Sequence, residues 1–172
     1  MKPTTVRAAG DTGLLHLLHR AGQCADELFT TAIGTLDLTP RQYAVLVAAS
    51  RADDLSQTAL VEQTGIDRST IADIVRRLVD RGLLQRRRTR QDARMYAVRL
   101  SPSGRNAVSV AIPVARQTDE KLLAMLPAAQ RGQLVEALQH MVETLGPISS
   151  AGGPGRVSLE DSSGPKRKLR FA

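Results

Sequence analysis

Two short helical patterns, separated by a tight turn and followed at once by an arginine-rich segment, constrain the fold of this chain more than any other feature. Ser56 is placed to cap a short helix that stops at Thr64–Gly65, and Asp67 is placed to cap a second helix, with Gly82 just after its end. The apolar residues of the second helix recur at i, i+3, i+4 and i+7, at Ile71, Ile74, Val75 and Leu78. This arrangement predicts a helix-turn-helix.

The segment after the second helix concentrates the positive charge of the chain. Residues 83–89 and 95–100 alternate loosely and predict a two-stranded hairpin with its turn between them. From Asp67 to Arg99 there are ten arginines against four aspartates, so this segment carries +6 of the formal net charge of +7. Its partner should therefore be anionic. Because the chain has no tryptophan, two tyrosines and two phenylalanines, it offers few stacking platforms for single strands or RNA, and duplex DNA is favoured.

The other patterns are helical, so the predicted fold class is mainly α with a small β-hairpin wing, a winged helix-turn-helix joined to a helical lobe. Residues 14–36 carry apolar side chains at helical spacing, and Thr39 begins the next helix with a capping box. A long helix is expected from residue 102 to about 125, and Pro113 should kink it or split it in two. A final helix is expected to end at residue 146.

Composition excludes several classes of protein. The single cysteine, Cys24, allows no intramolecular disulfide, and the first residues lack the apolar core of a signal peptide. The longest apolar run, residues 43–49, is too short to cross a membrane, so no membrane partner and a cytoplasmic location are expected. The sequence has no glycine-rich phosphate loop, no metal-ligand framework and no nucleophile elbow. We therefore expect no enzyme activity, no cofactor and no metal.

The predicted helix-turn-helix and hairpin match the grooves of duplex DNA, since one helix fits the major groove and a basic hairpin reaches the adjacent minor groove. The candidate DNA contacts on the exposed face of the second helix are Arg68, Ser69, Thr70, Asp73, Arg76 and Arg77. The candidate phosphate contacts of the hairpin are Arg86, Arg87, Arg88 and Arg90. Asp92, two residues before Arg94, is expected to pair with that guanidinium and fix its direction at the hairpin tip.

The segment "GLLQRRRTRQDARMYAVRLSPSGR" resembles the wing signature of the MarR family of bacterial transcription regulators. Its matching features are Gly82-Leu83, an arginine-rich strand, the tip Asp92-Ala93-Arg94 and the closing residues 100–105. The preceding "LTPRQYAVL" and "LSQTALVEQTGIDRSTIADIVRRL" resemble the helices that come before the wing in that family. The resemblance covers roughly residues 10–146. It implies that Ser69 and Thr70 approach bases, although capping of their own helix is an alternative role, and that Arg94 enters the minor groove.

The resemblance also implies a domain organisation. A regulator domain would span residues 14–146, in which 14–36 and 102–146 interlock two chains as a homodimer and 39–100 bind DNA. Residues 1–13 would be a flexible N-terminus. Residues 147–172 are rich in Gly, Pro and Ser and end in "PKRKLRFA", which predicts a disordered basic tail.

The family further implies a small-molecule pocket between the DNA-binding and dimerisation lobes. The candidate lining residues are polar or cationic side chains on otherwise apolar helices, namely His16, His19, Arg20, Arg41, Tyr43 and Arg116. That mixture suits an effector that is a small aromatic acid, a phenol or the acyl part of a coenzyme A thioester. The expected function is therefore a ligand-responsive repressor released from a pseudo-palindromic operator.

Two alternatives remain open at this stage. The same scaffold could serve a thiol or metal sensor, through Cys24 or the His16–His19 pair, although a buried structural cysteine and surface histidines are the commoner cases. A nucleoid-type architectural protein would bind DNA without any effector. It would discriminate little between promoter fragments.

Overall fold

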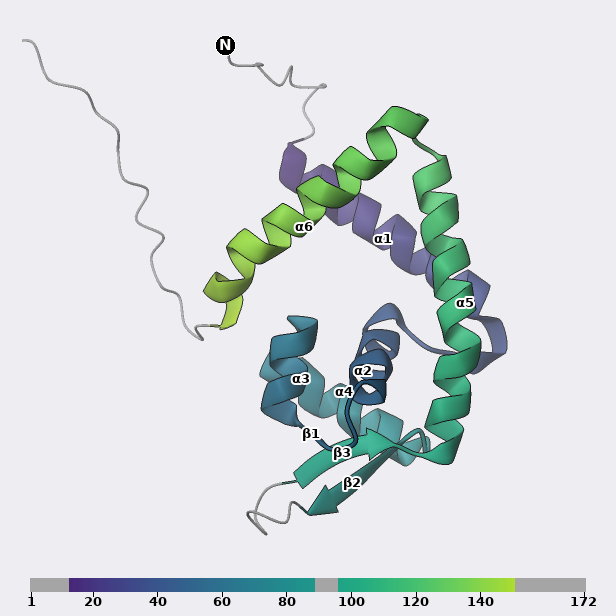
Figure 1. Ribbon diagram of the computed structural model, residues 1–172, viewed down its shortest axis with the longest axis vertical. Helices are drawn as coiled ribbons and strands as arrows, with labels where there is room; N and C mark the ends of the chain where they lie inside the picture. Colours follow the sequence, from purple (N-terminus) through teal and green to yellow (C-terminus); the bar gives the residue numbers. More distant parts are fainter. Residues whose placement is uncertain (1–12, 89–95, 151–172) are drawn as a thin grey trace, which may run out of the picture.

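The computed structural model describes residues 13–88 and 96–150 and shows a mostly helical molecule with one small sheet (Figure 1). In chain order the elements are α1 (Leu14–Ile33), the 3-10 turn η1 (Gly34–Leu36), α2 (Pro40–Ser50), β1 (Leu55–Ser56), α3 (Gln57–Thr64), α4 (Arg68–Asp80), β2 (Leu84–Arg88), β3 (Tyr96–Leu100), α5 (Pro102–Ala124) and α6 (Ala128–Ser150). This confirms the predicted fold class, a helix-turn-helix with a β-hairpin wing and additional helices. Within the described ranges, no helix is long and apolar enough to cross a membrane.

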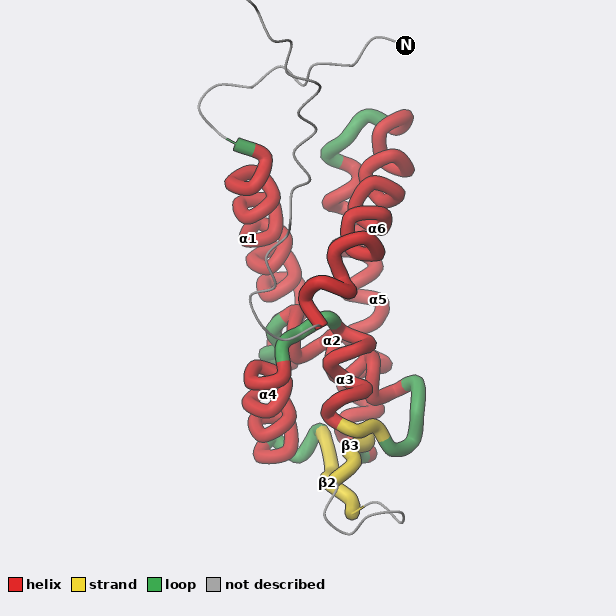
Figure 2. The backbone as a smooth tube through the Cα atoms, turned by 90° about the vertical axis from the view of Figure 1, so that its left-hand side faces the viewer, coloured by secondary structure: helices red, strands yellow, loops and turns green. Residues whose placement is uncertain are grey.

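The elements form two lobes that meet around α2 and α5. One lobe holds α2, α3, α4 and the sheet, and the other holds α1, α6 and the far half of α5 (Figures 1 and 2). The first lobe contains most of the core, whose fully buried large side chains include Leu38, Val45, Leu46, Leu60, Ile71, Val75, Leu78, Leu84 and Val98. By contrast, no described side chain of α6 is fully buried. The stability of the single chain therefore comes mainly from the helix-turn-helix lobe.

The sheet has three antiparallel strands in the order β1-β3-β2. In the hairpin Leu84 lies opposite Leu100 and Arg88 opposite Tyr96, and β1 pairs Leu55 with Val98. β1 was not predicted from the sequence, because two residues are too short to show strand alternation. Leu55 is 7% exposed, so this short strand also contributes an apolar side chain to the core.

Local capping signals correctly located four helix starts, of which the Asp67 cap of α4 is described with the interface below. Thr39 and Gln42 form the predicted capping box, with the Gln42 N–H donating to Thr39 Oγ1 at 3.2 Å and the Thr39 N–H donating to Gln42 Oε1 at 3.1 Å. Ser56 Oγ accepts from the Ala59 N–H at 3.1 Å, and Ser101 Oγ accepts from the Gly104 N–H at 2.9 Å. A side-chain acceptor at each position satisfies an N–H group that the helix itself leaves free.

Three predicted helix features were wrong. The first helix ends at Ile33 rather than at residue 36, because Gly34 adopts φ +56° and the chain continues as the short 3-10 turn η1. Of the two alternatives for Pro113, the split is wrong, because α5 is continuous from Pro102 to Ala124, and the kink stays a prediction. Proline removes one backbone donor, and burial of Ala111 just before it keeps the helix packed on the core. The last helix continues to Ser150, past the predicted end at residue 146. The expected flexible N-terminus (apart from Gly13) and the tail beyond residue 150 lie outside the described residues.

The wing is fastened to the start of α5 by a close contact. Ser101 donates its Oγ–H to the Gly82 carbonyl at 2.6 Å and its N–H to the Leu83 carbonyl at 3.0 Å. Gly104 faces the same carbonyl, and a Cβ added at Gly104 would lie 2.0 Å from Leu83 O. The base of the hairpin and the first turn of α5 therefore form one packed unit.

We expect Gly104→Ala to lower the free energy of unfolding by about 1–3 kcal/mol, because its methyl group would overlap a backbone carbonyl that cannot move alone. Urea denaturation at fixed protein concentration measures the change. Gly132→Ala in α6 is the matched control, since no atom lies within 4 Å of an added Cβ there, and it should be neutral or stabilising by up to about 1 kcal/mol. Equal stability of the two variants would contradict the close contact.

Candidate nucleic-acid interface and small-molecule cavity

The N-terminus of α4 is organised around Asp67. Its Oδ1 accepts from the Thr70 N–H at 2.9 Å and from the Ser69 hydroxyl at 2.6 Å. The hydrogen bonds from Ser69 and Thr70 hold the pKa of the Asp67 carboxyl well below its usual range. The Ser69 hydroxyl proton is thus engaged in the free protein, so Ser69 offers a base an acceptor oxygen rather than a donor.

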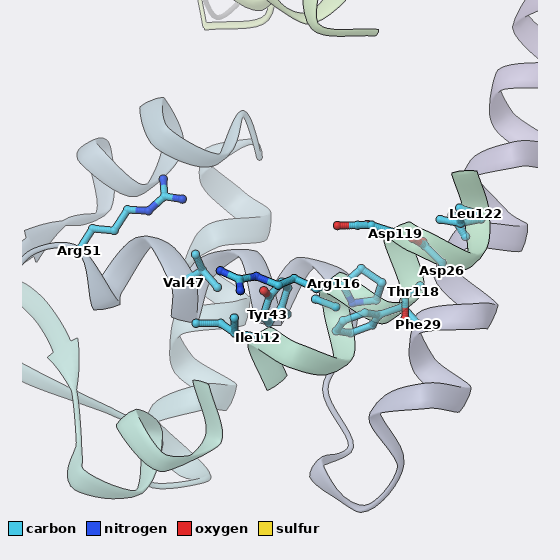
Figure 3. Close-up of a pocket in the computed structure, with 13 residues that line it drawn as sticks. Asp26, Phe29, Tyr43, Val47, Arg51, Ile112, Arg116, Thr118, Asp119 and Leu122 are labelled. Atoms are coloured by element: carbon cyan, nitrogen blue, oxygen red, sulfur yellow. The ribbon is translucent and has the colours of Figure 1, made fainter. Parts of the chain in front are cut away.

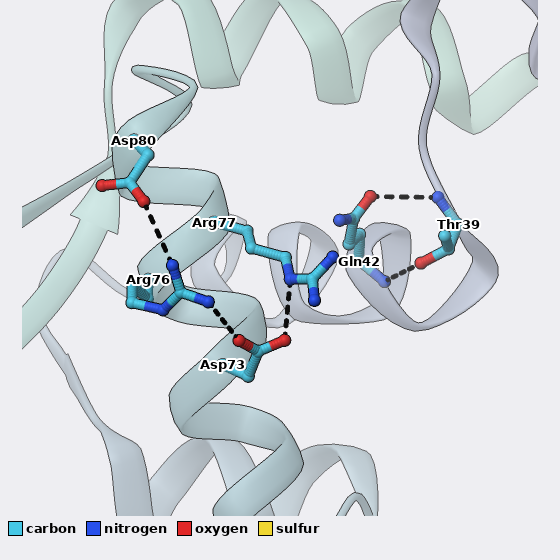
Figure 4. Close-up of polar contacts among 6 residues, drawn as sticks. All are labelled: Thr39, Gln42, Asp73, Arg76, Arg77 and Asp80. Carbon is cyan, nitrogen blue, oxygen red and sulfur yellow. Dashed lines mark hydrogen bonds and ion pairs between the residues drawn. The ribbon is translucent and has the colours of Figure 1, made fainter.

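The exposed face of α4 carries an ion-pair network centred on Asp73 (Figure 4). Its two carboxylate oxygens accept from Arg76 Nη2 at 2.6 Å and from Arg77 Nε at 2.7 Å, and Arg76 Nη1 also lies 3.7 Å from Asp80 Oδ2. The hydrogen bond from Arg76, with the charge of Arg77, lowers the pKa of Asp73. Asp73 therefore stays ionised, orients two of the candidate DNA-binding arginines and neutralises part of their charge.

The candidate residues of the hairpin are only partly described. Arg86 and Arg87 are exposed on β2, across the sheet from Val98 and Ala97. Arg88 ends the strand. Arg90, Asp92 and Arg94 lie outside the described residues, so the expected Asp92–Arg94 pair stays a prediction.

The helix-turn-helix and the hairpin lie at the same end of the molecule, opposite the corner between α5 and α6 (Figures 1 and 2). Ile71, Ile74, Val75 and Leu78 form the buried face of α4, as its sequence pattern predicts. The opposite face leaves Arg68, Ser69, Arg76 and Arg77 exposed and Thr70 and Asp73 partly so. This end thus combines an exposed polar helix face with exposed strand arginines, which is the combination required for simultaneous groove and phosphate contacts.

A second candidate site is a cavity of about 440 Å³ between α1, α2 and α5 (Figure 3). Its apolar lining includes Phe29, Val47, Ile112, Ala115 and Leu122. The rings of Phe29 and Tyr43 pack at a centroid distance of 5.3 Å with an interplanar angle of 42°. This contact places an aromatic wall where the two lobes meet.

Polar groups of both signs line the same cavity. Arg51, Tyr43 and Arg116 come from α2 and α5, and Asp26 and Asp119 come from α1 and α5 (Figure 3). Burial raises the pKa of Tyr43, and the negative charge of Asp119 adds to the rise while Arg116 and Arg51 oppose it. The Tyr43 phenol therefore remains protonated at neutral pH and is available as a hydrogen-bond donor.

Two of the six candidate ligand-binding residues, Tyr43 and Arg116, line this cavity. Arg41 does not, because two residues before Tyr43 correspond to about 200° of rotation around α2. His16, His19 and Arg20 do not line it either, because the lining of α1 begins at Ala25, five or more residues later, which is about 7.5 Å or more along the helix axis.

Arg51 lines the cavity, and the sequence analysis missed it. Pro40, Tyr43 and Val47 follow a stripe along α2 at intervals of three and four residues, and four residues further this stripe reaches Arg51. Arg51 is the C-cap of the helix. Extending the stripe of Tyr43 by one turn would have found it.

The residues considered for sensing lie apart from the cavity lining. Cys24 lies on an exposed part of α1. This corrects the expectation of a buried structural thiol. The His19 ring nitrogen Nε2 contacts Gln23 Nε2 at 3.2 Å. Over the described residues there is no group of three or more His, Cys, Asp or Glu side chains placed to hold a metal ion.

Comparison with known proteins relates the chain to transcription regulators. The sequence model of the MarR family matches residues 36–95, from the end of η1 to the residue before β3. The chain is 32% identical over 108 residues to the transcriptional regulator HosA of Escherichia coli O157:H7, which covers 63% of this chain and 80% of HosA. It is 33% identical over 129 residues to the transcriptional repressor NicR of Pseudomonas putida, which covers 75% of this chain and 82% of NicR.

The fold is similar to a solved regulator as well. The structure of BpsR from Bordetella bronchiseptica, whose DNA binding is regulated by 6-hydroxynicotinic acid, matches with a TM-score of 0.70 and 32% identity. The match covers 75% of this chain and 92% of the BpsR chain. It therefore extends well beyond the helix-turn-helix lobe.

We expect Asp73→Asn to raise the affinity for arbitrary duplex DNA by about two- to fivefold, because it removes a negative charge beside the phosphates and weakens the pairing of Arg76 and Arg77. Fluorescence anisotropy with a scrambled duplex over a range of salt concentrations measures both the affinity and its salt dependence. The slope of log affinity against log salt concentration should steepen by about the amount that one additional phosphate contact contributes. Glu136→Gln on α6 removes the same charge far from α4 and should change neither quantity. Identical behaviour of the two variants would contradict the role of Asp73.

Proposed function

The chain belongs to the MarR family of transcription regulators, and from this premise we propose that it acts as a homodimeric repressor that binds a pseudo-palindromic duplex site and is released by a small aromatic acid. A phenol or the acyl part of a coenzyme A thioester is the alternative effector. The observation that carries the proposal is the cavity lined by residues of α1, α2 and α5, where the two lobes meet. An effector bound in this cavity would change the orientation of the two lobes relative to each other.

The proposed mode of DNA binding uses α4 in the major groove and the hairpin at the adjacent minor groove. Asp67 fixes the first turn of α4, so that Ser69 and Thr70 stand at its leading end. Arg86 and Arg87 stand on the strand that leads to the hairpin tip, where they would contact phosphates. Arg94 is proposed to enter the minor groove, whose narrow regions attract guanidinium groups.

The proposed homodimer is supported by apolar side chains that the single chain leaves exposed. Leu14 and Leu15 on α1 are 70% and 82% exposed, and Val142 and Leu145 on α6 are 70% and 53% exposed. Helices with such unpaired apolar stripes are stable when a partner covers them. A second copy of the chain would cover both helices and would present two α4 helices about one turn of DNA, or 34–36 Å, apart.

The chemistry of the cavity supports an aromatic carboxylate as effector. Phe29, Tyr43 and Ile112 supply an apolar wall, while Arg51 and Arg116 supply cationic groups for a carboxylate. A volume of about 440 Å³ suits a single substituted ring, so the nucleotide part of a coenzyme A thioester would extend outside. Because α1, α2 and α5 all contribute, a bound effector would alter the angle between the lobes and thus the separation of the two α4 helices.

The first test of this proposal is Arg94→Ala in a gel-shift titration on duplexes selected from a random library by the unmodified protein. We expect affinity to fall about tenfold or more through loss of a charge-assisted contact, while gel filtration still shows a dimer. Arg131→Ala at the start of α6 removes the same charge away from the DNA-binding end and should bind normally. Unchanged binding of Arg94→Ala would overturn the wing assignment, and a monomeric protein would overturn the proposed mechanism.

The second test measures thermal unfolding with hydroxybenzoic acids, hydroxynicotinic acids and their coenzyme A thioesters. A true effector at a hundredfold excess over its Kd should stabilise the protein by about 2.7 kcal/mol and raise the Tm. Arg116→Gln should abolish most of the shift, and Tyr43→Phe should reduce it while keeping the ring contact with Phe29. Arg41→Gln, outside the cavity, should keep the full shift. Equal effects of Arg41→Gln and Arg116→Gln would show that the ligand binds elsewhere.

A further inference from the structure

Arg81, the C-cap of α4, contacts the link between α1 and α2. Its guanidinium Nη1 donates to the Asp37 carbonyl at 2.7 Å and its Nη2 donates to the Leu36 carbonyl at 2.8 Å. These partners lie 44 and 45 residues away in the sequence. Arg76 and Arg77, by contrast, pair with Asp73 within α4. Arg81 thus joins the end of the DNA-reading helix to the link between α1 and α2.

The link that Arg81 holds contains two residues in unusual backbone conformations. Gly34, the first residue of the 3-10 turn η1, has φ +56°, and Asp37, which follows the turn, has φ +47°. Conformations of this kind are where a chain changes direction between rigid elements. The direction of α1 relative to α2 is therefore set within four residues.

Both ends of the contact are anchored in the DNA-binding lobe. Leu38, just after the link, is 1% exposed. At the other end, the Arg81 N–H donates to the Arg77 carbonyl at 3.0 Å and the Leu83 N–H donates to the Leu78 carbonyl at 2.9 Å, so the end of α4 is closed by backbone hydrogen bonds. The part of the link free to change direction is consequently Gly34–Asp37, and the Arg81 side chain spans its second half.

The surroundings leave the link room to move. A hollow of about 400 Å³ lies beside the contact, lined by Asp37, Thr39, Gln42, Arg77, Asp80 and Arg81. Close packing does not hold the link on this side, because the hollow is open there. On this side the two hydrogen bonds from Arg81 restrain the link, while the partly buried side chain of Leu36 packs against the core.

We propose that Arg81 is a positioning residue that fixes the angle between α1 and α4, and through it the half-site separation that the dimer accepts. This inference rests on the proposed function, because it requires a dimer that reads two half-sites. The planar guanidinium directs two N–H groups at two successive carbonyls. A lysine ammonium keeps the charge but not this fork.

Arg81→Lys is the test variant, and Arg76→Lys on the same helix is the matched control. Both are measured by fluorescence anisotropy on the selected operator, on versions with one or two base pairs added or removed between half-sites, and on a single half-site. One base pair changes the separation by about 3.4 Å and the rotation by about a tenth of a turn, so the unmodified protein should discriminate strongly against altered spacings. In Arg81→Lys we expect this discrimination to fall at least threefold, with half-site affinity unchanged.

Arg76→Lys should keep the discrimination of the unmodified protein while its affinity for all duplexes changes together. An unaltered spacing profile in Arg81→Lys would overturn the inference. Loss of half-site binding by Arg81→Lys would also overturn it, because the contact would then serve the folding of α4 itself. If the unmodified protein is a monomer, or shows no spacing preference, the proposed function fails first. The two failures are therefore distinguishable.

Discussion

The amphipathic character of α4 is the constraint on which the rest of the structure depends. Ile71, Ile74, Val75 and Leu78 are buried along one face, and their burial fixes the helix in the core by the hydrophobic effect. The opposite face must then meet water or DNA. Because the buried apolar face holds the helix in place, the charged groups on the exposed face do not have to contribute to its stability. Its N-terminus is fixed independently, by the carboxylate of Asp67 accepting two hydrogen bonds. The apolar face thus fixes the position of α4, and the polar face is available for DNA recognition.

The electrostatics of that polar face balance attraction against selectivity. In the proposed complex Arg68, Arg76 and Arg77 would attract phosphates, but Asp73 accepts hydrogen bonds from Arg76 and Arg77 and holds their guanidinium groups in place. An arginine that is already paired with a carboxylate loses part of that pairing when it contacts a phosphate. DNA of the wrong sequence would therefore gain less binding free energy from such an arginine. The hairpin differs: Arg86 and Arg87 have no ion-pair partner among the described residues. The positive charge of α4 is thus partly neutralised by its own aspartates, whereas, over the described part of the chain, the charge of β2 is not.

Sequence reasoning succeeded where structure is decided locally. The caps at Thr39, Ser56, Asp67 and Ser101, and the buried stripe of α4, follow from residues three or four positions apart, which a sequence displays directly. It failed where partners are distant. β1 exists only because Leu55 pairs with Val98, and the contact of Arg81 joins residues 44 and 45 positions apart. The cavity lies between these cases: Tyr43 and Arg116 were found from residue type, Arg51 was missed, and Arg41 was included although it lies on another face of α2. For the hairpin tip the prediction remains one from sequence alone.

The connections between the cavity and the DNA-binding end determine what an effector is able to do. α5 is one continuous helix despite Pro113, and it runs from the base of the wing, where Ser101 and Gly104 contact Leu83, to the cavity lined by Ile112 and Arg116. The link at Asp37 provides a second connection, from α1 to the end of α4 through Arg81. The wing and α4 are thus tied to different cavity-lining helices, α5 and α1. A ligand that moves these helices relative to one another would displace both DNA-reading elements. Release would then need no change in any DNA-contacting side chain, which leaves those side chains free to be selected for sequence recognition alone.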